Sequence, residues 1–229
     1  SDVYKRQGIG KTISTLFPAV KALGLGHVEK LFYLTAKTIG RTVAEKAVED
    51  MRSEGLQLKS LTLTARDKIC FKPNGGTRCD TDQCPFAIGY FDRINDALQD
   101  AFEHDAFTRP LIEEYAQKHQ VCPFEFSLEL SLWSDLIICD YNYVFDPRAH
   151  LKRFFEEEGG QYAFLVDEAH NLVDRAREMF SADLYKSEIL GVRRLVAKEQ
   201  PSLGKLLGDI NKYLLGVGKK VEGGGDGSA

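Results

Sequence analysis

The sequence has no long apolar run and no strong excess of basic residues. None of its apolar stretches approaches the ~20 residues that a membrane-spanning helix needs, and its start lacks the apolar core of a secretory signal peptide. We therefore expect no membrane partner and a cytoplasmic location. The net charge of −4 argues against a general nucleic-acid-binding protein, but a protein that holds its basic residues in a groove stays possible.

Close Cys-x-x-Cys pairs are also absent, although the chain has five cysteines. Without a secretion signal, metal ligation is a better interpretation than a disulfide framework. Cys70, Cys79, Cys84 and Cys122 lie in or after a turn-rich polar segment, whereas Cys139 lies in an apolar strand and is expected to pack. A zinc ribbon usually shows two close pairs, and two of the four cysteines precede proline, as in ferredoxin-type ligation. We expect a 4Fe–4S cluster on these four thiols, with zinc as the alternative.

A glycine-rich loop stands near the start, formed by Gly8, Ile9, Gly10, Lys11 and Thr12. Glycines without side chains let backbone N–H groups wrap a phosphate chain. The lysine then reaches the β- and γ-phosphates of ATP, and the threonine hydroxyl ligates Mg²⁺. The first glycine of the full pattern is missing, so a chance match at the start of a helix is the alternative.

An acidic box, Asp167, Glu168, Ala169 and His170, follows the apolar run 162–166. In parallel sheets, ligands bind beyond the carboxyl ends of the strands. There Asp167 can hold Mg²⁺ through water, Glu168 can polarise the attacking water, and His170 can link the site to a neighbouring element. With the loop lysine, we expect the two acids to be catalytic. An ordinary strand-to-helix turn capped by acids is the alternative.

Strand and helix patterns alternate along most of the chain. Strands are expected at 31–36, 58–64, 136–139 and 162–166, and helices at 13–23, 38–52, 151–158 and 171–180. This order predicts an α/β fold, a P-loop nucleotide hydrolase with a parallel sheet and helices on both faces. The order breaks at Asp67, where a loop and helices at 86–102 and 111–118 form an insertion closed by Cys122. A helical C-terminal segment follows at 184–215, with a break near Pro201.

Two groups of residues are candidates for contacts with nucleic acid. Thr35, Lys37 and Thr38 come just after a strand, and Arg66 and Lys68 flank the entrance to the cysteine segment. Hydroxyl and ammonium groups of this kind bind the sugar–phosphate backbone. Helix capping by Thr38 and a solvated basic turn at 66–68 are the alternatives.

Aromatic residues give a further choice between base stacking and the core. Tyr141, Tyr143 and Phe145 could stack on bases, although burial is the favoured interpretation. Trp133 is expected in the core as well.

The ordered set of motifs resembles the XPD/DinG-type iron–sulfur DNA helicases of superfamily 2. The resemblance spans about residues 8–182 and rests on GIGKT at 8–12, YLTAKT at 33–38, LTLTARDKIC at 61–70, QCPFA at 83–87, the run 121–147 and FLVDEAHNLVDRA at 164–176. It implies a RecA-like motor lobe that uses ATP and Mg²⁺ to move 5′ to 3′ along single-stranded DNA, in repair or replication stress. It also assigns Cys70, Cys79, Cys84 and Cys122 to a 4Fe–4S cluster.

The resemblance further implies a division into domains. Residues 1–7 are expected to be a non-native leader, 8–68 and 123–182 the two parts of the first RecA-like lobe, 69–122 the cluster insertion, 183–217 the start of a helical arch, and 218–229 a flexible tail. A second RecA lobe is missing from this pattern, so the chain alone is expected not to unwind DNA and to hydrolyse ATP poorly or not at all. The alternatives are a nuclease or RNA-directed ATPase of the same family, or a non-catalytic zinc-binding interaction module.

Overall fold

A computed structural model describes residues 7–36, 38–72, 79–147, 151, 154–155 and 159–223, with the backbone alone at 7–9 and 218–223. The chain divides into two compact units, Ser1–Phe180 and Ser181–Ala229, and each is described by itself. Among the described residues, no helix combines the length and the apolar character that a membrane crossing requires. The cytoplasmic location stays a prediction.

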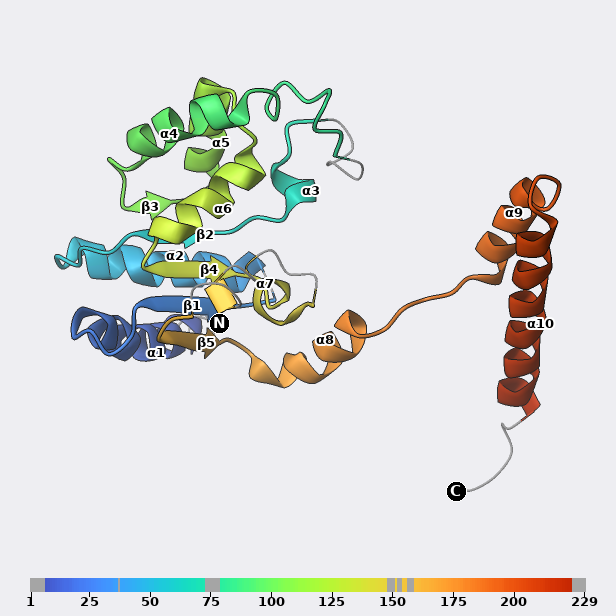
Figure 1. Cartoon of the computed structure of the whole chain (residues 1–229). Coiled ribbons are helices and arrows are strands. Elements are labelled where there is room, and N and C mark those ends of the chain that lie inside the picture. The colour runs from blue at the N-terminus through green and yellow to red at the C-terminus, as the bar shows by residue number, and fades with distance from the viewer. Residues whose placement is uncertain are drawn as a thin grey trace, which may run out of the picture. The chain divides into compact units, whose positions relative to one another are not determined.

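A five-stranded parallel sheet forms the centre of the first unit (Figure 1). Its strands are β1 (Lys30–Leu34), β2 (Ser60–Thr62), β3 (Ala106–Phe107), β4 (Leu136–Cys139) and β5 (Tyr162–Val166), in the order β3-β2-β4-β1-β5. Every pairing is parallel, which confirms the predicted α/β fold. β3 was not predicted: it belongs to the expected insertion and extends one edge of the sheet.

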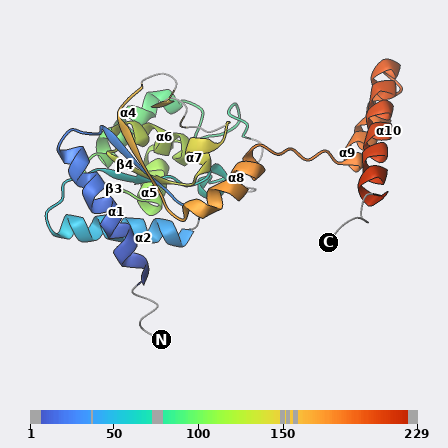
Figure 2. The same cartoon turned by 90° about the horizontal axis from the view of Figure 1, so that it is seen from below.

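Helices cover both faces of this sheet. On one face lie α1 (Gln7–Gly24) and α2 (Thr38–Ser53), and on the other α4 (Tyr90–Ala101), α5 (Arg109–His119) and α6 (Pro123–Trp133) (Figure 2). Successive residues of a strand point to opposite faces, so Leu31 and Tyr33 of β1 pack with α1 and α2. Phe32 and Leu34 pack with the other group. Strands β1, β2 and β4 are therefore buried between two apolar cores, whereas the edge strand β5 is only partly buried.

Hydrophobic spacing explains α2 but not α6. The buried residues of α2 are Ala44, Ala47, Val48 and Met51, which recur at helical spacing and form one face. α6 is buried nearly all round, because the sheet lies on one side and α4 and α5 on the others. A helix that is apolar on every side has no period to detect, and the sequence did not predict this one. Trp133, expected in the core, is 59% exposed at its C-terminal end.

Short helices stand at the carboxyl edge of the sheet. They are α3 (Arg66–Ile69), α7 (Asn142–Phe145), the 3₁₀ turn η3 (Ala169–Asn171) and α8 (Leu172–Met179). Each starts within a few residues of a strand end, so this edge gathers polar loop residues from β2, β4 and β5. The helix predicted at 151–158 falls mostly outside the described residues.

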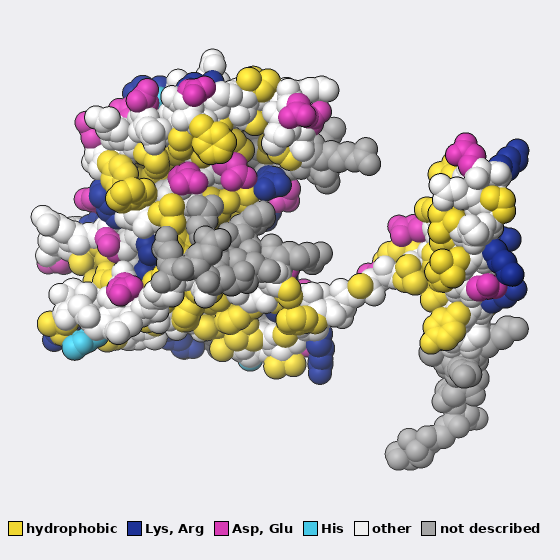
Figure 3. All heavy atoms as spheres, in the orientation of Figure 1, with side chains coloured by type: hydrophobic (Ala, Val, Ile, Leu, Met, Phe, Trp, Pro, Cys, Tyr) yellow, Lys and Arg dark blue, Asp and Glu magenta, His cyan; other side chains and the backbone are white. Residues whose placement is uncertain are grey.

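Two antiparallel helices, α9 (Lys186–Val196) and α10 (Pro201–Gly223), form the second unit. Proline opens α10, where its missing N–H costs nothing, and Gly204 allows close packing, since a Cβ there would lie 2.9 Å from the Ala197 Cα. α10 runs into the segment predicted as a flexible tail, and 224–229 lie outside the described residues. Hydrophobic side chains gather along one side of this hairpin (Figure 3), and Leu195 and Tyr213 are among the exposed ones.

Candidate functional site

The glycine-rich segment and the acidic box line one cavity. This nucleotide cavity has a volume of about 420 Å³ and is bounded by Lys11, Thr12, Thr35, Ala36, Ile39, Gly40, Val43, Asp167, Glu168 and Asn171. Its walls come from α1, the residues after β1, the first turn of α2, and the residues after β5. Because β1 and β5 are parallel neighbours, their carboxyl ends bring these segments to the same edge. Lys11 and Asp167 thus face one space, far apart as they are in sequence.

Asp167 is held by the strand next to it. Its N–H donates to the carbonyl oxygen of Leu34 at 2.9 Å, which continues the β1–β5 ladder by one bond. Its carboxylate oxygen Oδ2 accepts a hydrogen bond from the Thr35 hydroxyl at 3.3 Å. Thr35 is buried, so it lies inside the cavity wall and not on the open surface where we expected a nucleic-acid contact.

Gly40 is needed for this arrangement, and the sequence analysis did not single it out. A Cβ atom at this position would lie 2.1 Å from the Thr35 Oγ1 and 2.9 Å from Oδ2 of Asp167. The glycine therefore lets the first turn of α2 approach the acidic box closely. A lone glycine inside a predicted helix is a weak signal of such packing.

Two tyrosine hydroxyls also approach the acidic box. The Tyr141 hydroxyl donates to the carbonyl oxygen of Asp167. The carbonyl oxygen of Glu168 lies 3.3 Å from the same hydroxyl. The Tyr33 hydroxyl hydrogen-bonds with the Thr12 side chain, and burial raises the pKa of Tyr33 more than this bond lowers it. Burial also raises the pKa of Tyr141, and the nearby Asp167 charge raises it further. Both hydroxyls therefore stay protonated at neutral pH and are available as donors.

Glu168 turns the chain sharply after β5. Its backbone is left-handed, with φ 51° and ψ 47°, a conformation that is uncommon for a residue with a side chain and often marks functional sites. Its carbonyl oxygen accepts the N–H of Asn171 at 2.9 Å. The His170 Nδ1 lies 3.3 Å from the Glu168 Oε2, and both side chains are largely exposed. Glu168 thus lines the nucleotide cavity while its carboxylate also contacts His170.

The glycine-rich segment is helical in this structure. α1 begins at Gln7, six residues before the predicted start, so the segment forms the first turns of the helix. The first N–H groups of a helix have no partner within it, and here they belong to the glycine-rich residues. Lys11 is exposed and Thr12 is buried, whereas the side chain of Ile9 is not described.

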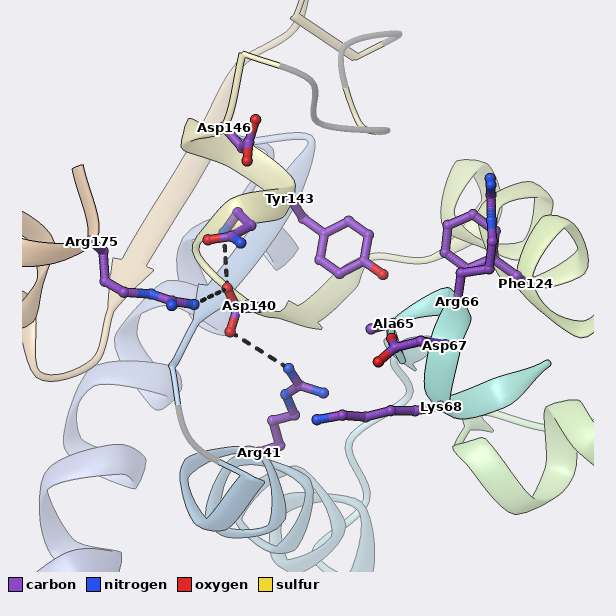
Figure 4. A pocket seen from close by; sticks show the side chains of 11 residues that line it. Arg41, Ala65, Arg66, Asp67, Lys68, Phe124, Asp140, Tyr143, Asp146 and Arg175 are labelled. Atoms are coloured by element: carbon purple, nitrogen blue, oxygen red, sulfur yellow. Dashed lines mark hydrogen bonds and ion pairs between the residues drawn. The ribbon is translucent and has the colours of Figure 1, made fainter. Parts of the chain in front are cut away.

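A second cavity, which we call the basic pocket, lies at the same edge of the sheet, beyond β2 and β4 (Figure 4). It has a volume of about 410 Å³ and is lined by Arg41, Ala65, Arg66, Asp67, Lys68, Phe124, Asp140, Asn142, Tyr143, Asp146 and Arg175. The Arg66 guanidinium lies 4.6 Å from the centre of the Phe124 ring and 3.5 Å from Glu125. The structure therefore gathers Arg66 and Lys68 in one hollow.

The other nucleic-acid candidates are placed differently. Thr38 is the first residue of α2 and is exposed, and Lys37 lies outside the described residues. Tyr141 and Tyr143 are buried in the core, as favoured, whereas Phe145 is 40% exposed.

The four candidate cluster ligands lie along the chain between the end of α3 and the start of α6. Cys70 follows α3 and Cys122 precedes α6, while the carbonyl of Cys84 accepts two N–H groups in the turn before α4. Burial raises the pKa of Cys122 above its ordinary value, and the nearby charges of Glu125 and Cys70 add to this. Cys79 is exposed, and Cys139 is buried as predicted.

No cluster-ready arrangement is formed by these thiols. Across the described ranges, no group of three or more His, Cys, Asp or Glu side chains is placed to hold a metal ion. The residues between the first two cysteines, 73–78, lie outside those ranges. Four thiols are donors that suit an iron–sulfur cluster, although the described side chains do not gather three of them at one point.

Comparison with known proteins agrees with the family resemblance of the sequence motifs. A family model, DEAD_2, matches residues 35–189. The Fanconi anemia group J protein homolog of Gallus gallus is 32% identical over 100 residues, 42% of this chain and 8% of that protein. The Regulator of telomere elongation helicase 1 homolog of Drosophila persimilis is 24% identical over 201 residues, 80% of this chain and 19% of that protein.

The fold also has a counterpart among solved structures. A chain titled XPD_Helicase aligns with a TM-score of 0.58 and 19% identity, over 88% of this chain and 35% of that one. This chain therefore spans at most about a third of the proteins it matches. The family match covers most of the chain and includes the acidic box, and it agrees with the order of motifs in the sequence. The chain belongs to the DEAD_2 family and, as its motifs predicted, is of the XPD/DinG type within superfamily 2.

Proposed function

We propose that this chain is the ATP-binding motor region of an ATP-dependent DNA helicase that moves 5′ to 3′ along single-stranded DNA. One observation carries the proposal: the side chains of Lys11 and Thr12 line the same cavity as those of Asp167 and Glu168. Relatives whose names include the word helicase support the unwinding activity, and roles in repair or replication stress belong to the same proposal.

Within the nucleotide cavity each residue has a distinct task. Lys11 neutralises the β- and γ-phosphates of ATP, and the first N–H groups of α1 add a partial positive charge. Thr12 and Asp167 hold Mg²⁺, which when bound offsets charge that develops on the phosphates. The Thr35 hydroxyl fixes the orientation of the Asp167 carboxylate.

Hydrolysis requires a polarised water beside the γ-phosphate. Glu168 orients this water and accepts its proton as the water oxygen bonds to phosphorus and the bond to the β-phosphate oxygen breaks. The left-handed backbone at Glu168 directs its side chain away from the continuing path of β5. His170 contacts this carboxylate and would link the hydrolysis site to a neighbouring element of the protein.

Nucleotide binding is testable with the chain itself. We expect Lys11→Ala to weaken the binding of a fluorescent Mg²⁺–ATP analogue at least about tenfold, which corresponds to a loss of ~1.4 kcal/mol in binding free energy. Lys21→Ala is the matched control, because Lys21 lies in the last turn of the same helix. Equal affinity for the two variants would overturn the proposal.

Unwinding is testable in the full-length parent. Glu168→Gln is expected to keep strand binding and to lose both ATP hydrolysis and unwinding, measured on duplexes that carry a 5′ or a 3′ single-stranded tail. Nuclease cleavage that survives this substitution, or stimulation by RNA in place of DNA, would favour the alternatives within the family.

We further propose that Cys70, Cys79, Cys84 and Cys122 hold a 4Fe–4S cluster. Support comes from the donor chemistry of four thiols, and from the packing of α6, which Cys122 precedes, on α3, which Cys70 follows. A bound cluster would brace these helices as a structural crosslink. Iron and acid-labile sulfide, measured after oxygen-free purification, test the proposal, and one zinc without sulfide would reject it.

Single-stranded DNA is proposed to cross the basic pocket. Arg66 and Lys68 support this, since both stand in a hollow at the carboxyl edge of the sheet. Each is expected to neutralise about one phosphate, so Arg66→Ala should reduce the salt dependence of oligo(dT) binding by about one unit of slope. An unchanged slope would remove the pocket from the DNA path.

A further inference from the structure

Asp140 joins two cationic side chains that come from different helices. It follows β4 directly, and its Oδ1 lies 3.0 Å from the Arg175 Nη2, while its Oδ2 lies 3.8 Å from the Arg41 Nη2. Figure 4 shows both guanidinium groups directed at this carboxylate. The side chains of Asp140 and Arg41 are only 16% exposed, and that of Arg175 30%. This is therefore a largely desolvated network, where charge interactions are stronger than on an open surface.

Three short chain connections link the network to the nucleotide cavity. Arg41 follows Gly40, which packs against Asp167. Arg175 lies on α8, which begins at Leu172 right after the acidic box. Tyr141, the neighbour of Asp140, donates its hydroxyl hydrogen bond to the Asp167 carbonyl. A shift of the acidic box must therefore move the partners of Asp140.

The same network forms one wall of the basic pocket. Arg41 also donates to the carbonyl oxygen of Leu63 at 3.4 Å, shortly before α3 with its two basic side chains. The Nε atoms of Arg41 and Arg175 are buried and make no hydrogen bond within the part of the chain that the structure describes. Arg175 pairs with Glu178 as well, through Nη1 at 3.1 Å. Asp140 is thus shared by two guanidinium groups, and because both arginines line the basic pocket, an anion bound there can compete with Asp140 for them.

We propose that Asp140 is a positioning residue that couples nucleotide binding to strand binding, by sharing Arg41 and Arg175 with a backbone phosphate in the basic pocket. The inference rests on the proposed function. When a bound nucleotide moves the acidic box, α8 and the start of α2 move with it, and the ion pairs of Arg175 and Arg41 with Asp140 change. The positive charge offered to the phosphate changes with it. Linkage requires the converse as well: a bound strand alters nucleotide affinity by the same factor.

The test measures oligo(dT) affinity with and without a non-hydrolysable Mg²⁺–ATP analogue. In the unaltered chain the analogue is expected to change strand affinity about fivefold or more, the usual range for coupled sites. Asp140→Asn frees both guanidinium groups, so we expect tighter strand binding without nucleotide, a salt dependence steeper by about one unit, and a nucleotide effect below about twofold. Asp140→Glu should restore much of the coupling.

Asp174→Asn is the matched control. Asp174 lies on α8, pairs with Arg177 at 3.1 Å, and is 81% exposed, so this variant changes net charge equally without touching the network. Equal shifts in the two Asn variants, or parallel loss of both affinities in Asp140→Asn, would overturn the inference. If Asp140→Asn fails to fold, Arg175→Gln takes its place and must weaken nucleotide-free strand binding and lower the coupling.

The binding measurements for the two ligands distinguish failure of the coupling role from failure of the proposed function. A chain that binds both ligands independently of each other leaves the proposed function standing and overturns the coupling role of Asp140. A chain that binds neither ligand overturns both.

Discussion

Gly40→Ala is the sharpest perturbation of the nucleotide cavity. The added Cβ would lie 2.1 Å from the Thr35 Oγ1, so that distance must open by about 1.3 Å to reach the 3.4 Å of ordinary contact. Thr35 is buried and β-branched, with a stiff χ1 angle. Either its hydroxyl rotates away from Asp167 or α2 moves outward, and both responses disturb the acidic box.

The cost can be worked from these contacts. Overpacking of this kind costs ~1–3 kcal/mol, and loss of the Thr35–Asp167 hydrogen bond adds ~1 kcal/mol. The better helix propensity of alanine returns at most ~1 kcal/mol in the first turn of α2. A net loss of about 1–3 kcal/mol follows, which for a domain of this size lowers Tm by about 2–12 °C.

Thermal unfolding and nucleotide titration together check this reasoning. Gly24→Ala is the control, since a Cβ there meets nothing within 4 Å and the position ends α1 in the same unit. Adding Thr35→Ala to Gly40→Ala should recover about 1 kcal/mol relative to additivity, because the closest atom is gone. A Gly40→Ala chain as stable as the control, with unchanged nucleotide affinity, would refute the close approach.

Three further predictions concern single side chains. Lys30→Met should lower the free energy of unfolding in urea by about 2–3 kcal/mol, because the buried ammonium donates to three carbonyl groups at the C-terminal end of α6; an unchanged urea midpoint would contradict it. Tyr33→Phe should weaken Mg²⁺–nucleotide binding about 2- to 10-fold. The factor should be the same at pH 6 and pH 9, since the raised pKa of Tyr33 keeps its hydroxyl protonated. Loss of the difference in affinity at pH 9 would show that the hydroxyl ionises. Lys118 and His119 lower the pKa of Asp100 below 3.8, so the stability that the ionised carboxylate contributes is present above that pH and lost as pH falls through the lowered pKa. The difference in urea midpoint between the unaltered chain and Asp100→Asn should therefore shrink between pH 7 and pH 2. A difference that stays constant would argue against the ion pair.

The central strands and the acidic box could be predicted because their signals are local. Apolar runs such as those of β1 and β4 are typical of strands buried on both faces, and both strands are fully buried here. Asp167 follows such a run, and parallel pairing then fixes the edge at which it stands. The placement of Lys11 in the same cavity follows from the same rule.

Elements that depend on long-range packing could not be predicted. The two-residue strand β3 is too short to show any alternation, and it exists because Ser60 and Leu61 of β2 offer a free edge. α6 has no polar face, since three neighbours bury it. The early start of α1 runs against the local pattern, because glycine is disfavoured inside helices and the glycine-rich residues therefore favour a loop.

The direction of side chains after a strand decides which ligand a residue can serve. Thr35 and Thr38 both follow β1, and the sequence offered the same backbone-binding role for both. One is buried against Asp167, whereas the other opens α2 and is exposed. Successive residues of an extended chain point to opposite sides, so a position or two separates the nucleotide cavity from the outer surface. Gly40, in the first turn of α2, has no side chain to displace the Thr35 hydroxyl or the Asp167 carboxylate, so the helix can pass close to both. Asp140, which follows β4 between β2 and β1 in the sheet, contacts Arg41 from α2 and Arg175 from α8, and so links the segments that come after β1 and after β5 at this edge.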